Sequence, residues 1–396
     1  MRRAKGLAGI AFALALAAPA FAQDQQLGAR TKAMGGSYTA FEDDPVLVWL
    51  NPAGIASQPD QVAVAYQTYT AYPKGRQLKG GVAVDTVKPE TVLSDPAFWP
   101  SYLGVVFQAG TPERPMAVGL CMAQPYVLNF SMDQVDDPAQ TVFVPEAEMK
   151  QSLSRFRAAA AMDFPLSPRG QPGFLTHVAA GLAIDVGYEQ WKFTSADEDL
   201  SDTSSGLGGG LGMLLGLYDD TESFKVNVGV AFQSMVRYEF KFDPDLLPSF
   251  HMPRQVNAGI TFYLLQGMPL RFTADVQFIH WSAAAEEPAY PRFNGIDDAV
   301  SFSLGAEYKM EIGERVRLYP RVGYRRFDAP WSDKDDLPMT GTYRLVLDTE
   351  ADAFSLVTFG LGLGWTSDAG KVRSVDVAGE MGGDSYNWAL GVTFEF

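Results

Sequence analysis

The last residues of the chain, "YNWALGVTFEF" (386–396), alternate strictly between two kinds of side chain. Every second residue from Tyr386 to Phe396 is large and apolar, and the residues between them are Asn, Ala, Gly, Thr and Glu. Successive side chains of a β-strand point to opposite faces, so this segment predicts a strand with one apolar and one small or polar face. Aromatic residues at both ends of the apolar face are typical of a strand that crosses a membrane.

The same alternation recurs upstream. In 225–241, for example, Val236 and Tyr238 continue the apolar face, while Arg237 and Glu239 continue the polar face. Unpaired charges are too costly to bury in a dry core, so the polar faces must meet water. The apolar faces then require a hydrocarbon covering. The pattern predicts a wall with lipid outside and solvent inside.

Counting these segments gives an all-β fold. Fourteen carry the pattern: 61–70, 101–110, 115–125, 152–165, 174–193, 206–218, 223–241, 252–265, 269–281, 300–310, 315–327, 354–366, 371–381 and 386–396. Short turns alternate with long polar loops, which we expect at 126–151, 194–205, 242–251, 282–299 and 328–353. An even strand number with short turns at one rim is typical of bacterial outer-membrane barrels. We therefore predict a 14-stranded antiparallel transmembrane β-barrel over 61–396.

Residues 1–22 predict a secretory signal peptide. Three basic residues precede an apolar stretch at 6–18, which is too short to cross a bilayer, and Ala20-Phe21-Ala22 forms a small-x-small cleavage site. Together with the barrel, this predicts the outer membrane of a Gram-negative bacterium. Outer-membrane lipid and lipopolysaccharide are then expected partners. A terminal Phe396 is the expected signal for the barrel-assembly machinery.

Composition excludes several classes of function. The net charge of −16 argues against a nucleic-acid partner. One cysteine cannot form an intrachain disulfide, and the three histidines are too widely spaced for a metal motif. No Gly-x-Ser-x-Gly nucleophile motif is present. We expect no enzyme activity, no cofactor and no metal.

A run of glycines, "GLGGGLG" (206–212), lacks the Lys-Ser/Thr that ends a phosphate-binding loop. We interpret it as a strand whose inner face is glycine at Gly206, Gly208, Gly210 and Gly212. Such glycines admit another backbone or leave a passage, and barrel curvature is the alternative explanation.

Residues 23–60, which contain "DDPVLVWLNPAGIA" (43–56), lack the strand alternation. A fourteen-stranded barrel encloses a space that inward side chains cannot fill. We therefore predict that 23–60 is a plug inside the barrel, ended by Asn51, Pro52, Ala53 and Gly54. Pro52 would fix its own φ and Gly54 would adopt a positive φ. An extended periplasmic arm is the alternative.

The order of motifs resembles the FadL family of outer-membrane transporters. The matching stretches are the Gly-Gly, Asp-Asp and Asn-Pro-Ala elements of 23–60 and "PSYLGVVFQAGTPERPMAVGLCMAQPY" (100–126). Further matches are Pro253, Gly259, Asp275 and Trp281-Ser282, followed by the terminal phenylalanine. The resemblance implies passive diffusion of a hydrophobic small molecule, a long-chain fatty acid or an aromatic hydrocarbon. It also implies a plug, called a hatch in that family.

The resemblance also implies where ligands bind and leave. Members release the ligand sideways at a kink in the third strand, which here makes Gly119, Gln124 and Pro125 the exit candidates. Members often bind a carboxylate through basic residues that face the interior. The candidates here are Arg155, Arg157, Arg317, Arg321 and Arg325, which share faces of two strands. Alternatively, these arginines balance interior acids such as Asp275 and Glu307.

A second function remains open. Met34-Gly35-Gly36 and the stretch from Trp49 to Gly54 also resemble a related branch that includes shuttle proteins of type IX secretion. That resemblance implies a protein-interaction barrel that acts as a shuttle or scaffold in protein secretion.

Overall fold

The computed structural model describes residues 26–69, 75–79, 82–89, 92–93, 100–132, 135–137, 142–144, 147–167, 172–195, 199–220, 223–239, 250–264, 269–285, 298–328, 343–347, 353–382 and 385–396. The predicted signal peptide, residues 23–25 and most of the predicted loops lie outside these ranges.

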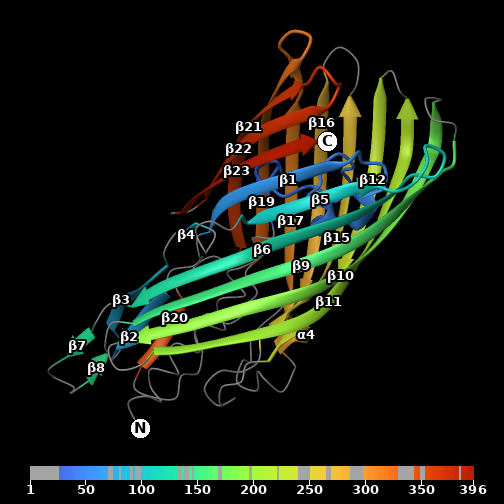
Figure 1. Cartoon of the computed structure of the whole chain (residues 1–396). Coiled ribbons are helices and arrows are strands. Elements are labelled where there is room, and N and C mark those ends of the chain that lie inside the picture. Colours follow the sequence, from blue (N-terminus) through green and yellow to red (C-terminus); the bar gives the residue numbers. More distant parts are fainter. Residues whose placement is uncertain are drawn as a thin grey trace.

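Fourteen strands form a closed antiparallel barrel (Figure 1). They are β1 (Gln61–Tyr69), β5 (Tyr102–Gln108), β6 (Met116–Met132), β9 (Ala147–Pro165), β10 (Gly173–Ser195), β11 (Asp199–Asp220), β12 (Phe224–Gln233), β15 (Arg254–Leu264), β16 (Leu270–His280), β17 (Ala299–Tyr308), β19 (Val316–Asp328), β21 (Ala353–Thr366), β22 (Val372–Gly382) and β23 (Ser385–Glu395). Each strand pairs with the next, and β1 pairs with β23, with Val64 opposite Val392. The predicted strand number is confirmed, and each of the fourteen predicted segments contains one wall strand, although the segment 223–241 leaves the wall after Gln233.

Shorter elements continue or connect these strands. They are β2 (Gly75–Lys79), β3 (Val82–Pro89), β4 (Val92–Leu93), β7 (Val135–Asp137), β8 (Val142–Val144), β13 (Val236–Tyr238), β14 (Phe250–Met252), β18 (Met310–Glu311), β20 (Tyr343–Leu347) and α4 (Trp281–Ala285). The predicted loops at 126–151 and 194–205 are wrong over much of their length. The strand β6 runs to Met132 and β9 starts at Ala147, and likewise β10 runs to Ser195 and β11 starts at Asp199. The sequence hides the extension of β11 because its first residues are mostly polar on both faces.

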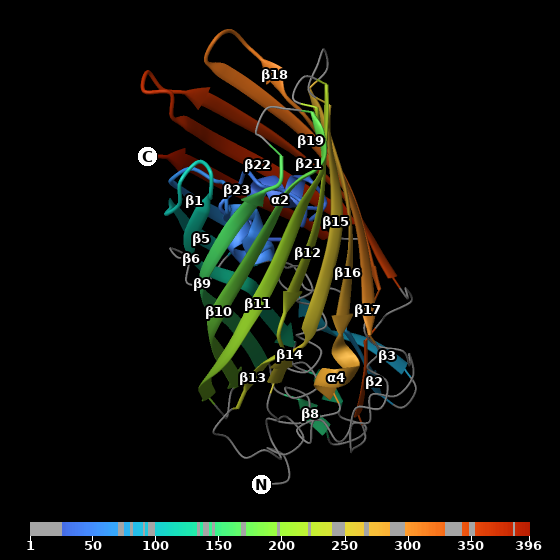
Figure 2. The same ribbon diagram turned by 90° about the vertical axis from the view of Figure 1, so that its right-hand side faces the viewer.

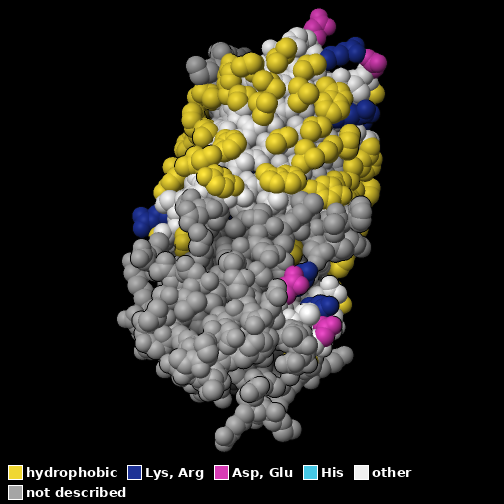
Figure 3. All heavy atoms as spheres, turned by 90° about the vertical axis from the view of Figure 1, so that its left-hand side faces the viewer, with side chains coloured by type: hydrophobic (Ala, Val, Ile, Leu, Met, Phe, Trp, Pro, Cys, Tyr) yellow, Lys and Arg dark blue, Asp and Glu magenta, His cyan; other side chains and the backbone are white. Residues whose placement is uncertain are grey.

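The outer surface of the barrel is apolar. On β17, for example, the side chain of Leu304 is 41% exposed and that of Ser303 is only 6% exposed. On the face shown in Figure 3, apolar side chains form a broad band over the wall, and the Lys, Arg, Asp and Glu side chains lie at the edges of this band and below it. This is the predicted orientation of the two strand faces. None of the described helices is long and apolar enough to cross a membrane.

The segment before β1 lies against the inner surface of the strands. It contains α2 (Ala29–Ala33), α3 (Leu47–Leu50) and the 3-10 helix η1 (Pro52–Ile55). Figure 2 shows α2 between opposite walls of the barrel. The helix α2 packs on β21, β22 and β23, whereas η1 packs on β9, β10 and β11. Most apolar side chains of the segment before β1 are buried, and Leu27, Met34, Phe41, Trp49 and Ile55 are fully so.

Inward-facing glycines bring this segment close to the wall. A Cβ on Gly229 would meet the backbone of Thr39, and a Cβ on Gly323 would lie 2.5 Å from the carbonyl carbon of Met34. On the predicted glycine face of β11, Gly212 has the same role, whereas Gly206 and Gly208 lie against β13. A Cβ on Gly212 would meet Asn51 and would lie 2.9 Å from the backbone nitrogen of Ala53. Of the alternatives, the close approach of another backbone is therefore the one observed.

The strands β13 and β14 leave the wall and pair with each other. The predicted outward direction of Val236 and Tyr238 is wrong, because both side chains are fully buried and Arg237 is exposed. Val236 packs on Gly206 and Gly208 of β11. The wall pairing of β12 ends at Gln233, so the residues beyond it follow a new direction although their alternation continues.

Candidate ligand path and binding groups inside the barrel

The four residues predicted to end the plug form one hydrogen-bonded turn. The Asn51 side chain accepts a hydrogen bond from the Ala53 N–H at 3.2 Å, and Pro52 occupies the first turn of η1. The Asn51 amide also donates to the carbonyl oxygens of Thr39 at 2.7 Å and Met213 at 3.2 Å. Asn51 therefore joins two parts of the N-terminal segment to strand β11.

The predicted positive φ of Gly54 is wrong. Gly28, Gly35 and Gly36 have positive φ values in this segment, and Gly54 does not. A Cβ on Gly54 would instead lie 2.7 Å from both the Leu47 side chain and the Phe41 carbonyl oxygen. Glycine is required at this position because a side chain would not fit, and not because the backbone adopts a positive φ.

Asp275 of β16 binds the N-terminal segment directly. Its carboxylate accepts hydrogen bonds from the backbone N–H groups of Tyr38 and Thr39, both at 2.8 Å, and from the Ser37 hydroxyl at 2.9 Å. Sequence analysis considered Asp275 as a counter-charge for arginines. The structure shows a carboxylate that anchors main-chain N–H groups.

Arg155 and Arg157 of β9 share one carboxylate. Asp185 of β10 accepts from Arg155 at 2.6 Å and from Arg157 at 2.5 and 2.8 Å, and all three side chains are buried. The guanidinium carbons lie 5.0 and 4.6 Å from the centre of the Trp49 ring. This pair of candidate ligand arginines is therefore engaged with an acid and with the N-terminal segment.

Arg321 belongs to a second group of charges. It donates to Glu307 at 2.6 Å and to Asp376 at 2.5 Å. Arg30 of the N-terminal segment donates to the same Glu307 at 3.1 Å. Glu307 is therefore a counter-charge for interior arginines, which was the alternative role considered from the sequence.

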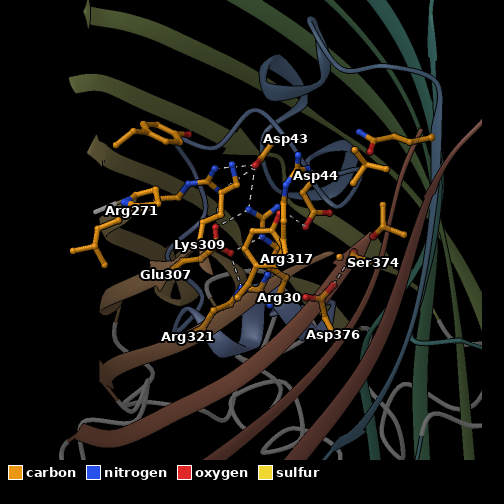
Figure 4. A pocket seen from close by; sticks show the side chains of 18 of the residues that line it. Arg30, Asp43, Asp44, Arg271, Glu307, Lys309, Arg317, Arg321, Ser374 and Asp376 are labelled. Atoms are coloured by element: carbon orange, nitrogen blue, oxygen red, sulfur yellow. Dashed lines mark hydrogen bonds and ion pairs between the residues drawn. The ribbon is translucent and has the colours of Figure 1, made fainter. Parts of the chain in front are cut away.

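These charges line a cavity of about 360 Å³ on the side of the barrel where the strands are joined by short turns (Figure 4). Arg317 and Lys309 lie at its edge, and the Arg317 side chain is 30% exposed. Asp43 also lines the cavity, 2.9 Å from Arg271. Burial raises the pKa of Asp43, but Arg271 and Arg30 outweigh it and lower the pKa to about 2.

Arg325 lies elsewhere. It donates to the Ser301 hydroxyl at 3.1 Å and to the Gln277 amide oxygen at 3.5 Å. It lines a separate cavity of about 40 Å³ together with Asp275. The five candidate arginines therefore occupy three different places and do not form one site.

The predicted exit residues have two different environments. Gly119 lies in a regular ladder, between Val106 of β5 and Ala159 of β9, so the prediction that it interrupts the ladder is wrong. Its missing side chain leaves room for Val48 of the N-terminal segment. Gln124 and Pro125 do interrupt β6, because together they lie opposite the single residue of β9 between Leu153 and Arg155. They form a β-bulge.

The strand next to this bulge, β5, ends at the same level of the wall. Tyr102, the first residue of β5, pairs with Ala65 on one side and Ala123 on the other. Both flanking strands continue beyond it. On the β1 side, β4 takes the place of β5 from Thr68 onward, with Leu93 opposite Thr68. On the β6 side, the next pairing among the described residues is with β3, at Phe130.

We call this interruption the wall window. Its edges are β1 at Tyr66 and Gln67, β6 from Gln124 to Asn129, and the first residue of β5. Ser101 closes its lower edge, because its hydroxyl donates to the Ala65 carbonyl oxygen and its own carbonyl oxygen accepts from the Gln124 N–H. The distances are 2.9 and 2.8 Å.

Sequence reasoning missed two residues of this interior. Asp185 was not singled out, although an acid on an inward face beside Arg157 would have suggested the pairing. Gln67 was missed as well, and its side chain is fully buried with no hydrogen-bond partner for its amide nitrogen or oxygen. Nothing in its local sequence marks it. The described residues also contain no cluster of three or more His, Cys, Asp or Glu side chains that could hold a metal ion.

No family model and no curated protein sequence matches this chain. Solved structures do resemble it. A FadL homologue of Pseudomonas aeruginosa matches 93% of this chain and 98% of its own, with 11% identity and a TM-score of 0.58. The Ralstonia pickettii toluene transporter TbuX matches 94% and 99%, with 14% identity and a TM-score of 0.56. The P. putida toluene transporter TodX matches 94% and 99%, with 12% identity and a TM-score of 0.54. The chain therefore has the FadL fold that its motifs predicted.

Proposed function

We propose that this protein carries hydrophobic small molecules across the outer membrane of a Gram-negative bacterium by passive diffusion. Long-chain fatty acids and aromatic hydrocarbons are the expected classes. The observation that carries the proposal is the β-bulge at Gln124 and Pro125, which lies beside the wall window, where β5 ends and β1 and β6 continue. The likeness of the fold to toluene transporters supports it.

In this proposal, residues 23–60 are the plug. The contacts of residues 26–60 support that role, because they join the segment to opposite walls. Asp275 holds Tyr38 and Thr39, and Thr358 of β21 donates to the Ala33 carbonyl oxygen at 3.1 Å. On the other side, Asn51 donates to β11. A segment fixed at so many points blocks straight passage through the barrel.

The charged cavity makes a straight route unfavourable. A hydrophobic molecule that moved past the plug toward the short turns would have to displace the hydration of Arg30, Asp43 and Glu307 without replacing it. A sideways route through the wall ends in hydrocarbon, where the free energy of an apolar molecule is lowest. The bulge at Gln124 and Pro125 is the proposed exit.

Uptake by a strain that lacks the gene tests the proposal. We expect slower uptake of labelled fatty acid or toluene than in the parent strain, with restoration by the gene on a plasmid. Equal uptake by the two strains would contradict the transport function. The shuttle function remains a prediction from sequence, and capture of secreted proteins by the purified barrel would favour it instead.

A further inference from the structure

The outer face of β10 changes from apolar to polar near the end of the strand. Every outward side chain from Leu182 to Tyr188 is apolar or aromatic and is exposed. Beyond Tyr188, the outward residues are Gln190, Lys192 and Thr194. Aromatic residues flank the apolar band of a membrane barrel at both interfaces, so the polar residues beyond Tyr188 lie at the level of the lipid head groups.

The strands on both sides of β10 present hydroxyl groups on the same outer face (Figure 1). The residues opposite Tyr188 and Gln190 are Ser154 and Ser152 on β9, and Ser205 and Thr203 on β11. All four are at least partly exposed. Hydroxyl and amide groups both donate and accept hydrogen bonds, as the hydroxyl groups of a sugar do. This part of the outer face therefore offers hydrogen-bonding groups where the neighbouring wall offers only apolar side chains.

Two lysines lie directly opposite each other beyond these hydroxyl groups. Lys150 of β9 pairs with Lys192 of β10. Their side chains are 49% and 53% exposed, so both ammonium groups are accessible from outside the barrel. Opposite residues of an antiparallel pair have Cβ atoms about 5 Å apart, and like charges at such positions destabilise a sheet. A phosphate bound between the two ammonium groups would remove this repulsion.

The acids near these lysines lie farther from the bilayer. Glu148 is 3.0 Å from the Lys150 ammonium group, and Asp199 is 3.7 Å from the Lys192 ammonium group. Both acids lie opposite Thr194, beyond the lysines along the strands. Exposed ion pairs of this kind are weak, and an ammonium group has three donors. The lysines therefore lie between the acids and the bilayer and can still donate to a phosphate.

We propose that this outer face of β9, β10 and β11 docks the phosphorylated sugar head group of lipopolysaccharide. The face lies at the end of the wall opposite the short turns, which is the outer-leaflet side of a membrane barrel. The two lysines bind a phosphate, the hydroxyl and amide side chains bind the sugar, and the acyl chains pack on the apolar face that ends at Tyr188. The proposal goes beyond transport, because this surface lies outside the barrel and away from the proposed ligand path.

Binding to the purified, detergent-solubilised protein tests the proposal. The probes are lipid A with its phosphates, the same lipid A without phosphates, and phosphatidylglycerol, an anionic lipid without an amino sugar. The variant combines Lys150→Gln with Lys192→Gln, two exposed positions where substitution should leave the fold intact. We expect the wild type to bind phosphorylated lipid A more tightly than the other two probes. The variant should bind it about tenfold more weakly, as for loss of one hydrogen bond to a charged group, and should bind the lipid A without phosphates as the wild type does.

Two further variants serve as matched controls. Lys371→Gln removes an exposed lysine in the short turn before β22, at the other end of the wall, and should leave the binding of all three probes unchanged. The combination of Lys150→Arg and Lys192→Arg keeps both positive charges and their ability to donate to a phosphate. This variant should bind phosphorylated lipid A as the wild type does.

Equal binding of phosphorylated lipid A to the wild type and to the glutamine variant would overturn the proposal. Wild-type binding of phosphatidylglycerol as tight as that of lipid A would also overturn it, because the surface would then recognise negative charge and not a phosphorylated sugar. A third contrary result is equal weakening of all three probes in a glutamine variant with a lower thermal midpoint, since the lysines would then act on the fold.

Discussion

Arg157 holds Trp49 by two contacts: its guanidinium carbon lies 4.6 Å from the centre of the indole ring, and its Nη1 donates to the Trp49 carbonyl oxygen. The same guanidinium is bound to Asp185. One buried cluster therefore joins two wall strands to the N-terminal segment. The stability of the wall and the position of the N-terminal segment therefore both depend on Arg157, Asp185 and Trp49.

Replacing the acid of this cluster should destabilise the protein strongly. Asp185→Asn keeps the shape of the side chain but leaves Arg155 and Arg157 buried without their carboxylate. Breaking a buried ion pair by removing one partner costs about 3–5 kcal/mol. We expect a clearly lower thermal midpoint in detergent. Asp298→Asn, which affects a partly exposed pair with His280, should change stability by less than about 1 kcal/mol. Equal midpoints for Asp185→Asn and the wild type would contradict this role.

Adding one methyl group to β11 should shift the N-terminal segment. A Cβ on Gly212 would meet Asn51 and would lie 2.9 Å from both the Ala53 nitrogen and the Pro52 side chain. Gly212→Ala should therefore raise the permeability of liposomes that contain the protein to small hydrophilic solutes. In Gly391→Ala, the new atom would lie 3.3 Å from the Ala29 methyl group, so little change is expected. Tight liposomes with Gly212→Ala would show that the segment does not control this path.

Acid should weaken the contacts of Asp43. Its pKa in the folded protein is about 2, below the value in an unfolded chain, so it stabilises the folded state above about pH 4. That contribution is lost as the pH falls through the folded pKa. We expect the thermal midpoint of Asp43→Asn to fall less than that of the wild type between about pH 4 and 2. The pKa of Asp44 is raised by burial, but Asp44 is present in both proteins and cancels in the difference. Parallel curves would contradict the assignment.

Removing the bulge of β6 should close the proposed exit. Deleting Pro125 puts Gln124 opposite the residue between Leu153 and Arg155, and keeps the pairing of Tyr126 with Leu153. The strand stays in register and the kink disappears. We expect uptake to fall to the level of the deletion strain. Pro125→Val keeps the extra residue and should retain uptake. A folded Pro125 deletion with normal uptake would exclude an exit at this bulge.

The sequence was sufficient to predict the wall, because lipid on one side and water on the other impose a period of two on every strand. Strand ends and side-chain directions were predicted wrongly where a strand no longer has lipid on one side and water on the other. Residues 199–205 carry mostly polar side chains on both faces, and Val236 and Tyr238 keep the alternation after the chain has left the wall. The interruption of β6 was predicted in part. Proline marks an interrupted ladder at Pro125, whereas Gly119 is explained only by Val48, which lies far away in sequence.

The candidate arginines show a further limit. Their inward direction follows from strand parity, but their partners depend on register and on the path of residues 26–60. Arg157 lies directly opposite Asp185 in the ladder of β9 and β10, a pairing that depends on the exact turn between the strands. Arg321 shares the carboxylate of Glu307 with Arg30, which belongs to the N-terminal segment and not to a strand. Neither relationship is encoded in the alternation of one strand.

The inward glycines have a consequence for how this gene tolerates mutation. Exchanges among apolar residues on the lipid side should be nearly neutral, since hydrocarbon has no fixed shape to match. Even alanine should be harmful at Gly181, Gly212, Gly229 and Gly323, where a backbone lies against the wall. A saturation scan of the barrel would therefore trace the N-terminal segment as a footprint of intolerant positions on the inner surface.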